Sequence, residues 1–233
     1  MPSLEEADAL LGRLDGILTG CKIGSQLFTA AGPAAIEAAR KRGFRVFLDL
    51  KFHDIPNTVG LAVREATRLG VFMLNIHASG GLAMARAGAE AAAKAAADFT
   101  IPRPLCVGVT VLTSLDRRAL QNEVGVPTSV ESHVLHLASV AREAGLDGCV
   151  ASPQEISPLR LAMGPKWVIV TPGIRWEAGA QRSGTAPDDQ VRIATPRRAL
   201  AAGADYLVIG RPISAAKDPG AAAAAIVAEL GAP

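Results

Sequence analysis

The chain has 233 residues, of which 49% are hydrophobic and only 4% aromatic, and its formal net charge is +2. This length and composition suit one α/β domain with an aliphatic core, and the absence of a Lys/Arg cluster argues against a nucleic-acid binder. Cys21, Cys106 and Cys149 lie singly in apolar runs, which indicates free buried thiols and a reducing compartment. The N-terminus lacks a signal-peptide pattern, and no apolar stretch is long enough to span a membrane. We therefore expect a soluble, cytoplasmic protein that binds no membrane.

Short runs rich in β-branched residues alternate with longer, Ala- and Leu-rich amphipathic segments. A first helix follows directly on Ser3, which "SLEE" predicts as its N-cap. The β-branched runs predict strands at residues 20–24, 45–51, 71–78, 105–112, 147–152, 167–173 and 205–210. The segments between and after them predict helices at 33–42, 57–69, 81–97, 129–144, 153–163, 196–202 and 219–230.

Strict alternation of strands and helices predicts a parallel sheet, and at this length the expected fold is a (β/α)8 TIM barrel over a single domain, residues 1–233. An open doubly wound sheet is the alternative, but no G-x-G-x-x-G follows the first strand. The pattern supplies seven strands, and the expected first strand of a barrel is missing before the first helix. Either that strand lies upstream of Met1, or the barrel has an open seam between residues 20–24 and its last strand.

The stretch "RVFLDLKFHDIPNTV" combines a strand pattern with several charges. Because side chains alternate along a strand, Asp49 and Lys51 should share the inward face near its carboxyl end, where barrel active sites lie. Lys22, at the end of the preceding strand, can add a second ammonium, and Asp54 lies just beyond. Charges in such a position are either paired for structure or functional, and a coupled cluster in a cleft favours function. We expect Asn57 or Thr58 to cap the next helix.

A second candidate region is "VIGRPI", which ends the last strand with Gly210 and Arg211, shortly before Ser214. "TPGIR" ends the preceding strand with Arg175. The loops after the last two strands of a barrel often bind phosphate, and a guanidinium matches phosphate oxygens. The sequence thus predicts an anion site opposite the charged strand.

With these residues in place, the sequence resembles the orotidine 5′-phosphate decarboxylase family in its bacterial form. The resemblance rests on "FLDLKFHDIPNTV", "VTVLTS", "GLDGCVASPQE", "TPGIR", "DDQVRIATP" and "GADYLVIGRPI", in this order over nearly the whole chain. It implies conversion of orotidine 5′-phosphate to uridine 5′-phosphate (UMP) and carbon dioxide, without a metal or cofactor, by a homodimer with shared active sites.

The resemblance also implies a role for each matching residue. Lys51 would protonate carbon 6 of the pyrimidine, Asp49 would lie against the substrate carboxylate, and Lys22 would pair with Asp49 and contact the ribose. The partner subunit's site would receive Asp54, Ile55 and Thr58. Thr113 would lie near the pyrimidine, and the phosphate would be held by Arg175, Gln190, Gly210 and Arg211.

Two departures from the family are visible. The family begins with a strand whose Asp binds the ribose, which is the missing first strand. The segment 175–190 is several residues longer than the usual loop of the family, and Trp176 replaces a common Pro.

Two alternatives stay open. One is a magnesium-dependent sugar-phosphate decarboxylase or aldolase of the same barrel type, against which Lys22 argues because such relatives carry a metal-binding acid there. The other is a non-catalytic remnant that binds a phosphate ligand. We interpret His77 as a packing residue, and His133 and His136 as helix-surface residues.

Overall fold

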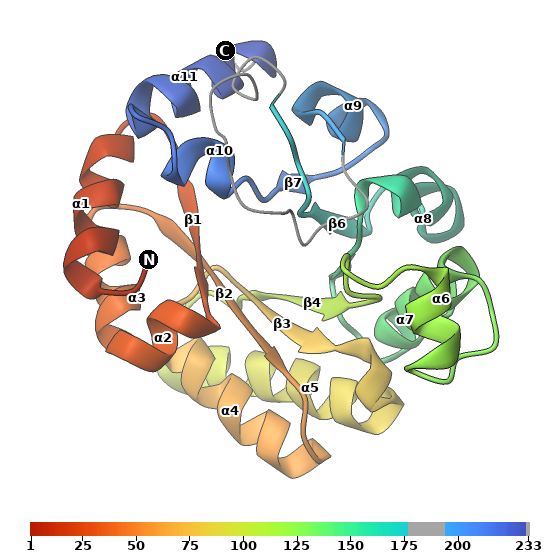
Figure 1. Ribbon diagram of the computed structural model, residues 1–233. Helices are drawn as coiled ribbons and strands as arrows, with labels where there is room; N and C mark the ends of the chain where they lie inside the picture. The colour runs from red at the N-terminus through yellow and green to blue at the C-terminus, as the bar shows by residue number, and fades with distance from the viewer. Residues whose placement is uncertain (177–193, 232–233) are drawn as a thin grey trace.

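The computed structural model describes residues 1–176 and 194–231. In these residues seven parallel strands form one curled sheet in the order β1-β2-β3-β4-β5-β6-β7, with helices around its outside (Figure 1). The strands are β1 (Gly20–Gly24), β2 (Arg45–Phe52), β3 (Met73–His77), β4 (Leu105–Val109), β5 (Gly148–Val150), β6 (Val168–Thr171) and β7 (Tyr206–Leu207). Each lies within a predicted range or extends it by one residue, so the predicted parallel barrel architecture is confirmed.

Eleven α-helices occur in the described residues, and N-cap side chains mark where several of them begin. They are α1 (Leu4–Leu14), α2 (Ser25–Ala31), α3 (Pro33–Lys41), α4 (Pro56–Arg68), α5 (Leu82–Phe99), α6 (Arg117–Asn122), α7 (Val130–Glu143), α8 (Ile156–Met163), α9 (Pro196–Ala201), α10 (Arg211–Ser214) and α11 (Pro219–Glu229). Ser3, Ser129 and Thr195 each accept a hydrogen bond from the first turn of their helix. The helix ranges predicted from the sequence did not include α2, α6 and α10, because all three are too short to show a helical period.

Apolar side chains separate into two layers. The larger layer lies between the sheet and the helices and includes Leu48, Leu74 and Ile76. The smaller layer fills the inside of the curled sheet around Met73 and Val107. Alternate residues of β3 thus face opposite layers, as expected of a strand.

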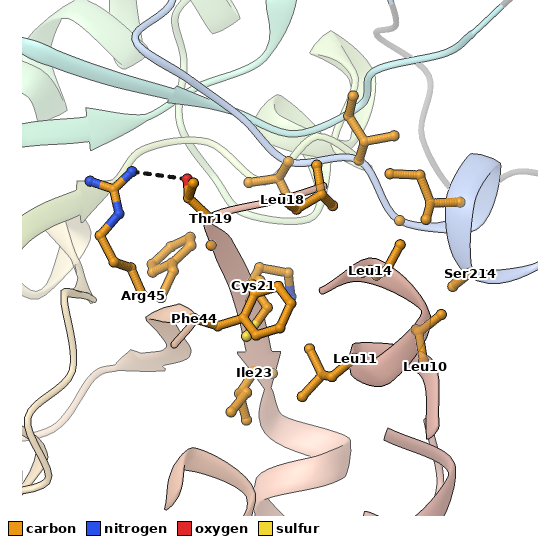
Figure 2. Close-up of a pocket in the computed structure, with 18 of the residues that line it drawn as sticks. Leu10, Leu11, Leu14, Leu18, Thr19, Cys21, Ile23, Phe44, Arg45 and Ser214 are labelled. Carbon is orange, nitrogen blue, oxygen red and sulfur yellow. Dashed lines mark hydrogen bonds between the residues drawn. The ribbon is translucent and has the colours of Figure 1, made fainter. Parts of the chain in front are cut away.

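The seam predicted from the missing strand lies between β1 and β7. These are the two ends of the sheet, and no pairing joins them in the part of the chain that the structure describes. An apolar cavity of about 800 Å³ occupies this position. Figure 2 shows Leu11 and Leu14 of α1, Cys21 of β1 and Ser214 of α10 around it.

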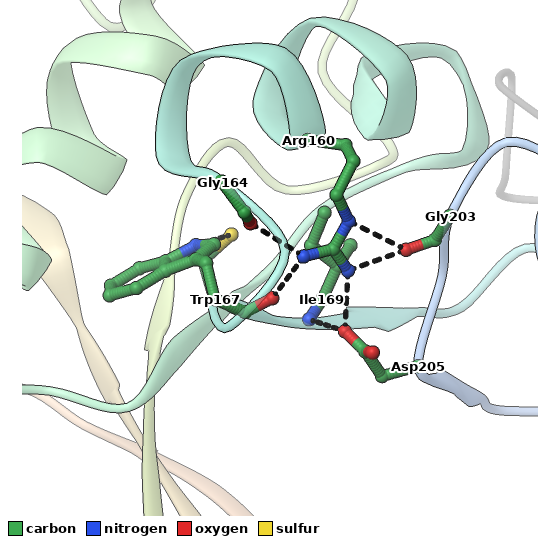
Figure 3. Close-up of polar contacts among 7 residues, drawn as sticks. Arg160, Gly164, Trp167, Ile169, Gly203 and Asp205 are labelled. Carbon is green, nitrogen blue, oxygen red and sulfur yellow. Dashed lines mark hydrogen bonds and ion pairs between the residues drawn. The ribbon is translucent and has the colours of Figure 1, made fainter.

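Arg160 of α8 ties together the loops that lead into β6 and β7 (Figure 3). Its guanidinium donates to three backbone carbonyls and to the carboxylate of Asp205, which also accepts from the amide of Ile169 at 2.7 Å. The carbonyls belong to Gly164, Trp167 and Gly203. This network lies at the amino ends of the strands, opposite the charged cluster, and no sequence motif pointed to it.

Candidate active site

Strand β2 brings Asp49 and Lys51 to the carboxyl edge of the sheet. The pairing of β2 with β3 shifts register between Leu48 and Phe52, and Lys51 has a φ of 53°, in the left-handed region that a non-glycine residue rarely adopts. The prediction that both side chains face the same space is confirmed, since both line one pocket. The simple alternation behind that prediction is nevertheless interrupted at Lys51.

The Asp49 carboxylate is the centre of the cluster. Its Oδ1 accepts from Lys51 Nζ at 2.7 Å and from Asn75 Nδ2 at 2.6 Å. Its Oδ2 lies 2.8 Å from Lys22 Nζ. Only 11% of the Asp49 side chain is exposed, whereas Lys22 and Lys51 retain 34% and 37%. The carboxylate is therefore fixed, and each ammonium keeps access to the pocket.

Two opposing effects set the pKa of Asp49. Burial by itself raises this pKa, because it penalises the charged form. The charge and hydrogen bond of Lys22, with the hydrogen bonds of Lys51 and Asn75, lower it, and the net result is a pKa below the ordinary value. Asp49 is accordingly ionised at neutral pH.

A pocket of about 750 Å³ connects this cluster to the predicted anion-binding loops. Lys22, Asp49 and Lys51 line one part of it. The other parts include Thr113, which follows β4, and three residues that follow β6 and β7, namely Arg175, Gly210 and Arg211. Seven of the residues singled out in the sequence thus line one cavity at the carboxyl edge of the sheet.

Asp54, Ile55 and Thr58 do not line this pocket. All three are exposed, at the point where the chain leaves β2 and begins α4, and 67% of Ile55 is accessible. The prediction that Asn57 or Thr58 caps α4 is wrong. Ile55 is the N-cap, because Pro56 suits the first helical position and its ring fixes φ there. Gln190 lies outside the residues that the structure describes.

Two side chains on β3 adjoin the cluster. Asn75 is fully buried and was not identified in the sequence, although a polar residue on the inward face of an apolar strand was a usable signal. The ring of His77 lies 5.2 Å from that of His53. Burial, followed by the charges of His53 and Lys51, lowers the pKa of His77, so its imidazole is neutral at neutral pH.

Other chemistries have less support in the described residues. His133 and His136 lie together on α7 with ring centroids 6.2 Å apart, and no group of three potential metal ligands occurs among residues 1–176 and 194–231. Ser152 and Glu155 hydrogen-bond each other in a buried capping box. No helix in these ranges is both long and apolar enough to cross a membrane.

Comparison with known proteins shows which family the chain resembles. The sequence pattern of the orotidine 5′-phosphate decarboxylase / HUMPS family matches residues 1–226. An orotidine 5′-phosphate decarboxylase of Moorella thermoacetica is 55% identical over 230 residues, which cover 99% of this chain and 89% of that protein. One from Pseudomonas aeruginosa is 51% identical, with coverage of 99% and 94%.

Solved structures show the same similarity. The crystal structure of orotidine 5′-phosphate decarboxylase from Lactobacillus acidophilus superposes with a TM-score of 0.85 at 34% identity, covering 100% of this chain and 96% of that one. An uncharacterized conserved protein from Geobacillus kaustophilus gives a TM-score of 0.82 at 35% identity, with coverage of 99% and 96%.

Proposed function

This chain belongs to the orotidine 5′-phosphate decarboxylase / HUMPS family, and we propose that it decarboxylates orotidine 5′-phosphate to UMP, the last step of de novo pyrimidine nucleotide synthesis. The observation that carries the proposal is the Asp49 carboxylate with a lysine on each oxygen, at 2.7 and 2.8 Å, at one end of the pocket. Arg175 and Arg211 line the same pocket. A nucleotide whose reacting carbon and phosphate lie at opposite ends fits this distribution of charge.

The reaction explains why an ammonium would face a carboxylate here. Loss of carbon dioxide from carbon 6 leaves an electron pair in the plane of the pyrimidine, with no conjugated group to accept it. In the proposal, Lys51 stabilises this carbanion electrostatically and transfers a proton to it. A fixed charge aimed at a developing charge is the most effective form of such stabilisation.

Asp49 would hold Lys51 in place and lie beside the departing carboxylate of the substrate. Repulsion between the two carboxylates would raise the energy of the bound substrate and would be relieved as carbon dioxide leaves. Lys22 would pair with Asp49 and contact the ribose, and Thr113 would lie near the pyrimidine.

The phosphate end would supply binding energy away from the reacting carbon. Arg175, Gln190, Gly210 and Arg211 are the residues proposed to hold the phosphate. A guanidinium can donate two parallel hydrogen bonds to phosphate oxygens. Energy gained at a non-reacting group can lower the barrier when it is realised in the transition state.

The alternative within this group of barrels is a magnesium-dependent sugar-phosphate decarboxylase or aldolase. Such an enzyme needs an additional acid beside Asp49 to hold the metal. The neighbour of Asp49 on β1 is Lys22, 2.8 Å away. A cation at this position repels a divalent metal, so the observation favours the metal-free reaction.

We also infer a homodimer in which Asp54 of each subunit reaches the site of the other, with Ile55 and Thr58 in the interface. The support is the exposure of Ile55, the N-cap of α4, and of Leu61 in its first half, 67% and 58%, since exposed apolar groups in one region are typical of a contact surface. As an enzyme of nucleotide synthesis, the protein is inferred to act in the cytoplasm.

The direct test is the ultraviolet absorbance of orotidine 5′-phosphate mixed with the purified chain, with and without EDTA. We expect loss of the substrate band at the same rate in both. The Lys51→Ala variant should be inactive but still bind UMP, and Lys41→Ala, which removes an exposed lysine paired with Glu37, should be fully active. A flat trace for the unmodified chain, or full activity of Lys51→Ala, would refute the proposal.

Shared active sites have a separate test. Lys51→Ala and Asp54→Ala homodimers should each be inactive, and mixing them under exchange conditions should restore about a quarter of the activity, because half of the dimers are hybrids with one intact site. No recovery after proven subunit exchange would show that Asp54 acts in its own subunit.

A further inference from the structure

The sheet changes register at the point where Lys51 enters the site. Pairing between β2 and β3 joins Leu48 to Leu74 and next joins Phe52 to Ile76. Four steps along β2 (48 to 52) therefore correspond to two along β3 (74 to 76). The two extra residues on β2 cannot follow the regular ladder, and Lys51, at a φ of 53°, is where the backbone accommodates them.

The side chain of Asn75 satisfies a backbone group that this irregularity displaces. The Lys51 amide N–H donates to Asn75 Oδ1 at 2.7 Å. Asn75 Nδ2 donates in turn to Asp49 Oδ1 at 2.6 Å. Asn75 is 0% exposed, so no water competes for either bond. The orientation of the amide is determined, because its oxygen faces a donor and its nitrogen faces a carboxylate.

These contacts link one buried amide to Asp49 and Lys51, the two residues of β2 that form the charged cluster. Its oxygen holds the Lys51 backbone in the left-handed conformation, which sets the direction of the lysine side chain. Its nitrogen occupies the same Asp49 oxygen that accepts from Lys51 Nζ at 2.7 Å. An acceptor and a donor on one rigid planar group are needed for this, and among side chains of this size only Asn supplies them.

We propose that Asn75 is a positioning residue for the reaction, which fixes the Lys51 ammonium and the Asp49 carboxylate relative to each other before substrate binds. This inference rests on the proposed function for its effect on turnover. Its structural part, the control of Lys51 and Asp49 by Asn75, concerns only the free protein. The two parts can therefore be tested separately.

The kinetic test uses Asn75→Ala and Asn75→Asp. A misplacement of about 1 Å at a reacting group can reduce the rate about 100-fold. We expect Asn75→Ala to lower kcat by about this factor, with KM changed by less than about threefold, because the phosphate end of the pocket is untouched.

Asn75→Asp keeps an acceptor for the Lys51 amide but places a second carboxylate against Asp49. Two carboxylates sharing a site titrate at separated pH values. We expect the acid limb of its pH–rate profile to move upward by about one pH unit or more, an effect that simple loss of stability does not produce. Ile76→Val, a truncation in the outer apolar layer of the same strand, is the matched control and should change stability without moving kcat or the profile.

The test that needs no turnover follows the Asp49 carboxyl carbon by NMR in protein labelled with ¹³C-aspartate. Asp49→Asn assigns the signal. We expect the pKa of Asp49 to be higher in Asn75→Ala than in the unmodified chain, and a crystal structure of the variant to show Lys51 with a negative φ. If both are unchanged, or if kcat of Asn75→Ala stays within about threefold of the unmodified chain, the proposal is wrong. An inactive unmodified chain would refute the proposed function instead, and the titration would still decide the role of Asn75.

Discussion

Replacing Asp49 by Asn removes the one negative charge that two lysines share, with almost no change in shape. Lys51 and Lys22 donate to separate carboxylate oxygens at 2.7 and 2.8 Å, and Asn75 donates at 2.6 Å. In Asp49→Asn the amide nitrogen must face at least one of these donors. The variant therefore loses at least one interaction outright and weakens the others.

The magnitude follows from burial. Hydrogen bonds to charged groups contribute about 1.5–3 kcal/mol each, but the lysine side chains are 34% and 37% exposed, so solvent screening reduces their share to about 1 kcal/mol each. Neutralising a buried carboxylate also removes its desolvation cost, which offsets part of the loss. We expect Asp49→Asn to lower the free energy of unfolding by about 2 kcal/mol at neutral pH.

The pH dependence has a definite sign. Because the pKa of Asp49 is lower in the folded chain than its ordinary value, its ionisation stabilises the fold above the unfolded-state pKa of about 3.9. That stability is lost as the pH falls from there through the folded-state pKa. The difference between the unmodified chain and Asp49→Asn should therefore be constant near neutral pH and shrink below about pH 4.

Urea unfolding of both proteins at several pH values measures this difference, since the other carboxylates titrate equally in each. Asp116→Asn is the matched control, because Asp116 caps α6 and Asn caps equally well. If Asp49→Asn is as stable as the unmodified chain at neutral pH, burial outweighs the two lysines. The reasoning about the cluster would then be refuted.

Three further predictions concern the backbone and the opposite end of the sheet. Lys51→Gly should be about 1 kcal/mol more stable than Lys51→Ala in urea unfolding, because glycine adopts a positive φ without strain; equal stability would mean that the bulge relaxes. Thr100 ends α5 at a φ of 53°, so Thr100→Gly should for the same reason raise the free energy of urea unfolding by about 1 kcal/mol; an unchanged value would mean that Thr100 is not strained. Arg160→Met should cost about 2–4 kcal/mol, because it removes the hydrogen bonds to three part-buried carbonyls and the ion pair with Asp205. Arg68→Met, at an exposed pair, should cost less than about 0.5 kcal/mol; comparable losses in thermal unfolding would contradict the role of the Arg160 network.

The strands and longer helices were predictable because their signals are local. Apolar runs, N-cap residues such as Ser129 and Thr195, and glycines after helices depend on the chain within a few residues. The pocket could be predicted indirectly, by adding a rule of the fold to the local signals: parallel strands place their carboxyl ends at the same edge of the sheet. That rule grouped Lys22, Asp49 and Lys51 correctly.

The features that could not be predicted from the sequence depend on contacts between residues far apart in the chain. The Arg160 network joins residues up to 45 positions apart, and no local pattern anticipates which carbonyls a guanidinium will meet. Asn75 lies 26 positions from Asp49, and only the register between β2 and β3 brings the two together. The predicted N-cap of α4 was wrong for a local reason. The preference of Pro56 for the first helical position outweighed the preference of Asn57 or Thr58 for the N-cap position.

Lys51 could be predicted in part from the local sequence, but its backbone conformation depends on contacts between strands. A positive φ at a residue other than glycine does not by itself mark a functional site, since Thr100 has the same φ and simply ends α5. At Lys51 the strained conformation coincides with a shift in strand register, a buried side-chain acceptor for its amide, and an ion pair within the pocket. Strain that several independent contacts maintain is typical of positions where function opposes local preference. Lys51 is therefore proposed as the reacting group because of the backbone that holds it as much as because of the charge it carries.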